Sequence, residues 1–216
     1  MPRTLRPATQ AWLALRSSLP AAPGALVTVT GKPTGSHGFT ISGKSYITIR
    51  NFTISGTLGH GISAILKCSF LTISGNHITG AGRSTSSSTV KHAISLAIAT
   101  NSLIQNNVLD NNTSAGVYLA VGSDNNTVDY NIVGFNASGY TDSSGAYHRL
   151  APGIDVRGSF NIISNNISHD NDDFGIQLVQ GANLNIVVNN VTYHNKDYPN
   201  SQAAITASMY RAPRAT

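Results

Sequence analysis

Short apolar runs, each opened by glycine or alanine, recur along most of this chain. The residue after each opening is apolar, and polar residues then alternate with Ile, Val or Leu over the next few positions. Alternation within short β-branched runs predicts strands rather than helices. The openings are Gly38, Gly61, Ala93, Gly116, Gly153, Gly175 and Ala204, with spacings of 23, 32, 23, 37, 22 and 29 residues.

A repeat with a period in the twenties predicts a solenoid in which each repeat forms one coil. The consensus of leucine-rich repeats is absent, and the units carry short β-branched runs separated by Asn or Gly. We therefore predict an all-β parallel β-helix of about seven coils. The strands that should stack in one sheet begin near Phe39, Ile62, Ile94, Val117, Ile154 and Ile176.

The pattern divides the chain into three segments. Residues 1–24 differ in composition from the rest, and we expect an N-terminal cap or a leader-like segment there. Residues 25–207 should form the β-helix domain, with a first strand over residues 25–30, and residues 208–216 an irregular tail. No apolar run approaches the roughly 20 residues that span a bilayer, so we expect no membrane insertion.

Asparagine follows the strands at a second fixed place in the repeat. Its side chain tolerates the left-handed backbone of a tight corner, and stacked amides can bond from coil to coil. We therefore predict a structural asparagine ladder, formed by Asn76, Asn107, Asn131, Asn166 and Asn190.

Extra residues enter at one place in the repeat, before the next opening, in residues 81–92, 137–152 and 196–203. Insertions at one corner of a solenoid build a wall on one side, which is usually the binding side.

Alternation along a strand places the residue after each inward apolar position on the outer face. We predict that this column is exposed and that Ile154, Val156, Ile163, Ile167, Ile176 and Leu178 are buried. Most outward positions are small, and the large or charged ones are Tyr118, Asp155, Arg157 and Gln177. The flanking loops contribute Tyr147, His148 and Arg149 on one side and Asp170, Asp172 and Asp173 on the other.

Charge is distributed unevenly along the chain. The net charge is +5, yet all nine acids are aspartates at or after Asp110. A basic first half attracts acidic polymers, but Lys and Arg are scattered singly, so we do not expect nucleic-acid binding. The single cysteine, Cys68, excludes an internal disulfide and is expected to be buried.

With its Gly-Ile openings and Asn corners, the segment 38–207 resembles the right-handed parallel β-helix proteins of the pectate-lyase-like superfamily. The resemblance implies a single-stranded right-handed helix, an extracellular or cell-surface location and action on polysaccharide. Asp172 and Asp173 match the Asp-Asp pair of polygalacturonases, whereas Pro152 occupies the place of that family's first acid. The Gly-His-Gly of that family should follow the pair, but here His60 lies three coils before Asp155.

Two chemistries on an acidic, uronate-containing polysaccharide remain open. Hydrolysis needs two carboxyl groups, for which Asp155 and Asp173 are the candidates. Elimination by a lyase needs a base such as His148, with Arg157 steering the substrate, and would use Ca²⁺ on oxygen ligands. The Ca²⁺ ligands would be Asp170, Asp172 and Asp173, and the substrate-binding residues Tyr118, Gln177, Tyr147 and Arg149.

The alternative is a non-catalytic structural, adhesive or carbohydrate-binding β-solenoid, in which the aspartates only cap exposed turns. A shared histidine metal site is not expected, because these residues fall on different coils, too far apart for one ion. They are His37, His60, His92, His148, His169 and His194.

Overall fold

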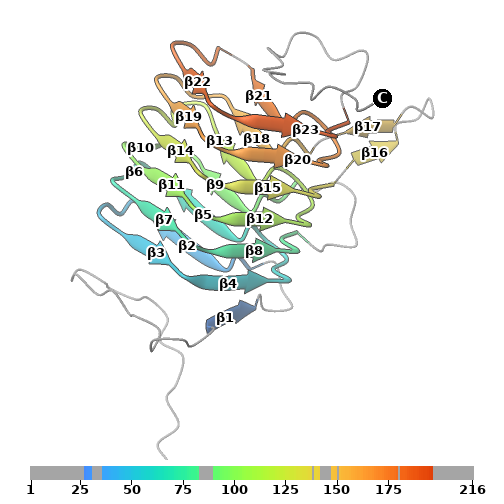
Figure 1. Ribbon diagram of the computed structural model, residues 1–216. Helices are drawn as coiled ribbons and strands as arrows, with labels where there is room; N and C mark the ends of the chain where they lie inside the picture. Colours follow the sequence, from blue (N-terminus) through green and yellow to red (C-terminus); the bar gives the residue numbers. More distant parts are fainter. Residues whose placement is uncertain are drawn as a thin grey trace, which may run out of the picture.

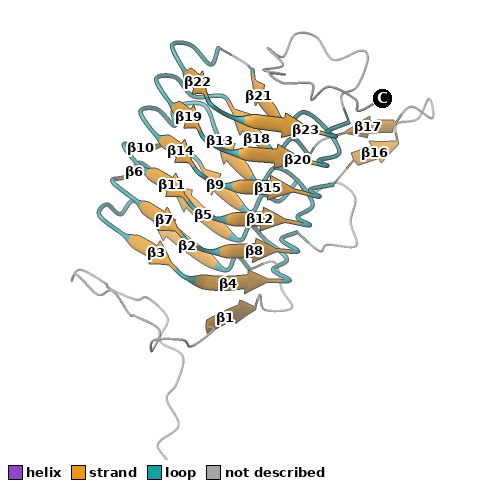
Figure 2. Ribbon diagram, in the orientation of Figure 1, coloured by secondary structure: helices purple, strands orange, loops and turns teal. Residues whose placement is uncertain are grey.

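The computed structural model describes residues 27–30, 36–82, 90–137, 139–141, 147–149, 151–179 and 181–196. This part of the chain consists of strands and loops wound into a stack of coils (Figures 1 and 2). Within it, no helix is long and apolar enough to cross a membrane. The predicted segment boundaries at residues 24 and 207 lie outside the described residues.

Three long sheets run along the stack, and every pairing within them is parallel. The first sheet contains β2 (Phe39–Ser42), β5 (Ile62–Ile65), β9 (Ile94–Leu96), β13 (Val117–Leu119), β18 (Ile154–Val156) and β21 (Ile176–Leu178). The second contains β3 (Thr48–Arg50), β7 (Thr72–Ser74), β11 (Leu103–Gln105), β14 (Thr127–Asp129), β19 (Ile162–Ser164) and β22 (Ile186–Val188). The third contains β1 (Val27–Thr30), β4 (Phe52–Ser55), β8 (His77–Thr79), β12 (Val108–Asp110), β15 (Ile132–Gly134), β20 (Ile167–His169) and β23 (Val191–Tyr193).

The first sheet confirms that the strands after the Gly or Ala openings stack together. Gly61 shows why a glycine suits that place. A Cβ atom there would overlap the Ile78 side chain and lie 2.6 Å from the carbonyl oxygen of Ala93 on the next coil. The opening therefore meets the demands of close packing between neighbouring coils, and its backbone conformation is an ordinary one.

The core fills the inside of the coils, and each sheet supplies it differently. Strands of the first sheet point their first and third residues inward, as with Ile154 and Val156. Strands of the second and third sheets point only the middle residue inward, as with Ile163 and Leu109. The predicted burial of Cys68 is confirmed.

The prediction that Ile167 is buried is wrong, because its side chain is 37% exposed. The inward place on β20 is its middle position, which holds the fully buried Ser168. Leu178, on the last described coil, is only partly buried against the core. The burial of Ile154, Val156, Ile163 and Ile176 is confirmed.

The predicted asparagine ladder is present. Amide Nδ2 donates to the Oδ1 of the next coil from Asn76 to Asn107 and onward to Asn131, Asn166 and Asn190, at 2.9–3.0 Å. The left-handed backbone was assigned to the wrong residue, however. Positive φ occurs one residue earlier, as at Gly75, Asn106 and Asn165, because the ladder residue has already turned inward.

A second amide ladder closes another corner and was not predicted. Asn112 donates to Asn136, Asn136 to Asn171 and Asn171 to Asn195, each at 2.9 Å.

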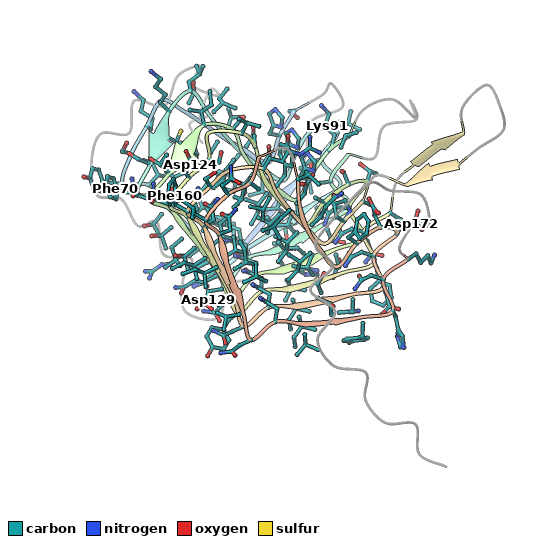
Figure 3. The ribbon with its side chains drawn as sticks, turned by 90° about the horizontal axis from the view of Figure 1, so that it is seen from above. Phe70, Lys91, Asp124, Asp129, Phe160 and Asp172 are labelled. Carbon is teal, nitrogen blue, oxygen red and sulfur yellow. The ribbon has the colours of Figure 1, made fainter. Side chains whose placement is uncertain are left out.

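The largest insertion, residues 137–152, carries an antiparallel hairpin. Its strands are β16 (Gly139–Thr141) and β17 (Tyr147–Arg149), and they project from the stack beside its C-terminal coils (Figures 1 and 3). A shorter parallel pair, β6 (Cys68–Ser69) with β10 (Ala99–Thr100), lies at a corner of the coils. Most residues of the other two insertions lie outside the described part.

We expect Asn107→Ala to lower the free energy of unfolding by about 2–4 kcal/mol. The variant removes the Oδ1 that accepts from the Asn76 N–H and amide, and the donor to the Ile73 carbonyl. The matched control is Asn106→Gly, which relieves a positive φ at an exposed position and should change stability by less than about 1 kcal/mol. Urea unfolding measures both, and equal losses would contradict the ladder's role.

A second pair of variants tests the inward and outward assignments. Ile163→Ala should cost about 2–5 kcal/mol, since its side chain is fully buried. Ile167→Ala should cost less than about 1 kcal/mol, because that side chain faces outward. Thermal melting would show a large difference between the two, and similar melting temperatures would overturn the assignment.

Candidate functional site

Three of the predicted site residues lie side by side on the first sheet. Tyr118 on β13 pairs in register with Asp155 on β18, and Asp155 pairs with Gln177 on β21. The stacking of the strands therefore brings together residues that are far apart in sequence. Arg157 follows β18 directly and lies on the same coil as Asp155.

Asp155 and Arg157 form a close ion pair. Nη2 and Nε of Arg157 lie 2.9 and 3.2 Å from Oδ2 of Asp155, and Nε lies 3.4 Å from Oδ1. The carboxylate side chain is 5% exposed and the guanidinium side chain 29%. The pair thus holds the guanidinium in one orientation while leaving part of it accessible.

The prediction that this outward column is exposed is wrong for several members. Asp155, Ser63 and Ser95 are 4%, 4% and 6% exposed. The serines are short, and the Asp155 carboxylate lies against the side chain of Arg157.

Burial and charge act in opposite directions on this pair. Burial raises the pKa of Asp155 above its usual value, although the hydrogen bonds and charge of Arg157 oppose that shift. Burial alone would lower the pKa of Arg157, but the bonds and charge of Asp155 outweigh it and raise that pKa. Arg157 is therefore a fixed cation and a poor proton acceptor.

Tyr118 connects this pair to a second group of side chains. Its ring centroid lies 5.1 Å from Cζ of Arg157, which is within range of a cation–π contact. The His92 ring stacks on Tyr118 at 4.3 Å with an interplanar angle of 13°. One phenol ring is thus in contact with a guanidinium and an imidazole.

Three histidines continue the stack across the preceding coils, and we call them the imidazole ladder. The ring of His92 lies 5.2 Å from that of His60, which lies 5.0 Å from that of His37, and the rings are within 5° of parallel. The rings of His37 and His60 each accept a hydrogen bond at Nδ1. The backbone N–H of His60 donates to Nδ1 of His37 at 2.8 Å, and the backbone N–H of His92 donates to Nδ1 of His60 at 2.9 Å.

The ladder ends where the sequence changes. The register of β9 and β13 places Ala115 opposite His92, so the next coil has no imidazole to continue it. Nδ1 of His92 is buried and has no hydrogen-bond partner among the described residues.

All three rings have lowered pKa values. Burial and the charge of Lys91 lower the pKa of His37. Burial lowers the pKa of His60 to about 4, with His37 and Lys91 contributing. Burial, with His60, Arg157 and Lys91, lowers the pKa of His92 well below its usual value. The imidazole ladder is therefore neutral at pH 7.

The places of these histidines on different coils exclude a shared metal ion but do not exclude contact between their rings. The same spacing was a signal for stacking. His37, His60 and His92 are separated by 23 and 32 residues, which are the spacings of the openings that follow them.

The remaining predicted residues do not gather into one group in the described part. Oδ2 of Asp170 lies 2.8 Å from Nδ1 of His169, and Oδ1 of Asp172 lies 3.4 Å from Nζ of Lys196. Asp173 is buried and precedes β21. Among the described residues, no three His, Cys, Asp or Glu side chains could hold a metal ion.

Tyr147, His148 and Arg149 form β17, paired with β16, and their side chains lie outside what the structure describes.

Seen along the solenoid axis, Lys91 lies away from the corner occupied by Phe70 and Phe160 (Figure 3).

We expect the free energy of unfolding to fall as the pH is lowered from about 6.5 towards 4. The unfolded chain takes up protons near pH 6.5, whereas folded His60 does so only near a pKa of about 4. The stability that depends on His60 should be fully present above about pH 6.5 and fully lost below about pH 4. The charged groups around the ladder are Lys91, Arg157 and Asp155, and the raised pKa of Asp155 acts in the opposite direction.

His60→Asn isolates the ladder's contribution, because the Asn Oδ1 can still accept the His92 N–H but the side chain does not titrate. The slope of this variant's unfolding free energy against pH should be smaller than that of wild type, by up to the equivalent of one bound proton. His194→Asn, at a histidine just after β23 whose side chain is 76% exposed, is the control and should change the pH dependence less than His60→Asn does. Denaturant unfolding at several pH values measures this, and an unchanged slope in His60→Asn would refute the assignment.

Comparison with known proteins addresses the fold. The family model described as "Right handed beta helix region" matches residues 27–190, which is most of the chain. No curated protein and no solved structure matches the chain. The stacked parallel sheets agree with the family model. The chain belongs to the right-handed β-helix family.

Proposed function

We propose that this protein binds an acidic, uronate-containing polysaccharide on the outer face of the first sheet. The observation that carries the proposal is the contact group of Tyr118, Arg157 and Asp155. A partly exposed guanidinium lies over a phenol ring, and a buried carboxylate fixes its orientation.

The chemistry of the group suits a sugar acid. A guanidinium presents N–H donors in a plane that matches a carboxylate, and its charge persists at all relevant pH values. An aromatic ring offers an apolar face against which the C–H face of a sugar can pack. Gln177, the register partner of Asp155, adds an amide that can donate to or accept from hydroxyl groups.

The electrostatics of the face favour an anionic ligand. Lys91 and Arg157 both lie close enough to depress the pKa of His92. Asp155 is the carboxylate bonded to Arg157, and Lys91 adds a second cation beside it. An anionic polymer would therefore meet two cations, Lys91 and Arg157, along this face.

Cleavage of the bound polymer is a second candidate, supported by the state of Asp155. Burial raises the pKa of Asp155, which is the direction that a general acid needs, although the ion pair with Arg157 opposes that shift. A hydrolase would use Asp173 as the partner carboxyl. A lyase of the pectate-lyase-like type would use His148 as the base, but Asp170, Asp172 and Asp173 are not grouped to hold Ca²⁺ in the described part of the chain. Either enzyme would act as a secreted or cell-surface protein.

A panel of pectate, alginate and neutral polysaccharides tests the proposal. Wild-type protein should bind the acidic polymers, and Arg157→Gln should weaken that binding by about tenfold or more. Arg50→Gln is the matched control, because it removes an exposed cation from the second sheet and should leave binding unchanged. If wild type binds none of the panel, the non-catalytic structural solenoid becomes the better reading.

The same panel separates binding from cleavage. A hydrolase releases new reducing ends, and a lyase also leaves unsaturated ends. If the chain cleaves the polymer, Asp155→Asn and Asp173→Asn should each reduce the yield of these products by orders of magnitude. A wild type that binds without product formation is a binding module, and melting curves of the variants show whether the fold survives.

A further inference from the structure

We propose that the imidazole ladder is a second part of the binding site, so that the polysaccharide lies along the solenoid axis and not across it. This inference rests on the proposed function. It assigns His37 and His60 a role in recognition and makes the occupant a chain long enough to reach from Arg157 to His37.

The first step is continuity. Arg157 lies over Tyr118, Tyr118 stacks on His92, and the rings of His60 and His37 follow at 5.2 and 5.0 Å. The row therefore crosses the coils of β18, β13, β9, β5 and β2 without a break. Its spacing is close to the roughly 4.8 Å that separates neighbouring strands.

The second step is the tautomer. A backbone N–H can only donate, so Nδ1 of His37 and of His60 must be the unprotonated nitrogen of a neutral ring. Nε2 then carries the proton. No hydrogen bond from these Nε2 atoms is made within the described residues, so each coil offers one ring N–H to a ligand oxygen.

The third step is the comparison with the asparagine ladders inside the coils. Asn131 is fully buried, its Oδ1 accepts from Asn107, and its Nδ2 donates to Asn166 and to the Ile104 carbonyl. A ladder with a purely structural role thus uses its amide on both sides. The imidazoles use one nitrogen for structure and keep the other, on partly buried rings at His37 and His60.

The fourth step selects the ligand. Parallel rings about 5 Å apart cannot direct their nitrogens to one metal ion at the usual bond length of about 2.0–2.1 Å. Lys91 adds positive charge beside the rings. A regular row of donors next to a cation fits the repeated hydroxyl and carboxylate oxygens of an extended sugar-acid chain.

Isothermal titration with oligouronates of increasing length, from the disaccharide upward, tests the inference. For wild type, affinity should rise with length until the row is filled. The double variant His37→Asn/His60→Asn keeps acceptors for the backbone N–H groups but removes the ring donors. It should bind the shortest oligomers like wild type and lose about tenfold or more for the long ones. The single variant His37→Asn, at the less buried end, gives a partial loss and serves if the double variant does not fold.

Two further variants make the outcomes distinct. Arg157→Gln should weaken short and long oligomers alike, and His77→Asn, at an exposed histidine on the third sheet, should weaken neither. If wild type binds oligouronates without any gain from length, or if the ladder variants bind long oligomers as wild type does, the ladder has no role in binding while the proposed function stands. If wild type binds no oligomer of any length, both proposals fail.

Discussion

The satisfaction of buried polar groups between neighbouring coils is the constraint on which this structure depends. Asn131 shows how it works. Its Oδ1 accepts the backbone N–H and the amide of Asn107, and its Nδ2 donates to a carbonyl of the preceding coil and to Asn166 of the next. A buried donor or acceptor without a partner costs about 1–3 kcal/mol, so no coil of this kind is stable without its neighbours. The coils are therefore expected to form and unfold together over several repeats.

The same stacking produces the functional face. Once neighbouring coils are locked in register, any residue type repeated at one place forms a row with the strand spacing. Inside the coils this gives the asparagine ladders, and at the edge of the first sheet it gives the imidazole ladder. The two kinds of ladder differ in burial, because Asn131 is fully buried whereas His37 and His60 are only partly buried. Burial lowers the pKa of each ring, to about 4 at His60 and well below its usual value at His92.

Much of the fold could be predicted from sequence because it depends on periodicity. The openings identify the first sheet, and Asn76 to Asn190 identify one ladder. Ile167 was misplaced because the third sheet turns only its middle residue inward, and a three-residue strand is too short to reveal which phase applies. The site was predictable only as far as register reaches. Tyr118, Asp155 and Gln177 follow from it, but the burial of Asp155 depends on how the Arg157 side chain folds back.

The Asp155–Arg157 pair is hard to explain by stability alone. The outward position that Asp155 occupies on its coil is occupied by Ser63 and Ser95 on earlier coils, where a small side chain is enough. A buried ion pair usually contributes little to stability compared with apolar residues of the same size, because both charges lose their hydration. Here burial raises the pKa of Asp155 even though Arg157 is bonded to it, whereas the pair raises the pKa of Arg157, so the arrangement favours the charged guanidinium more than the charged carboxylate. A solenoid with only a structural role has no need for that arrangement, whereas a site that must hold a guanidinium over the Tyr118 ring does.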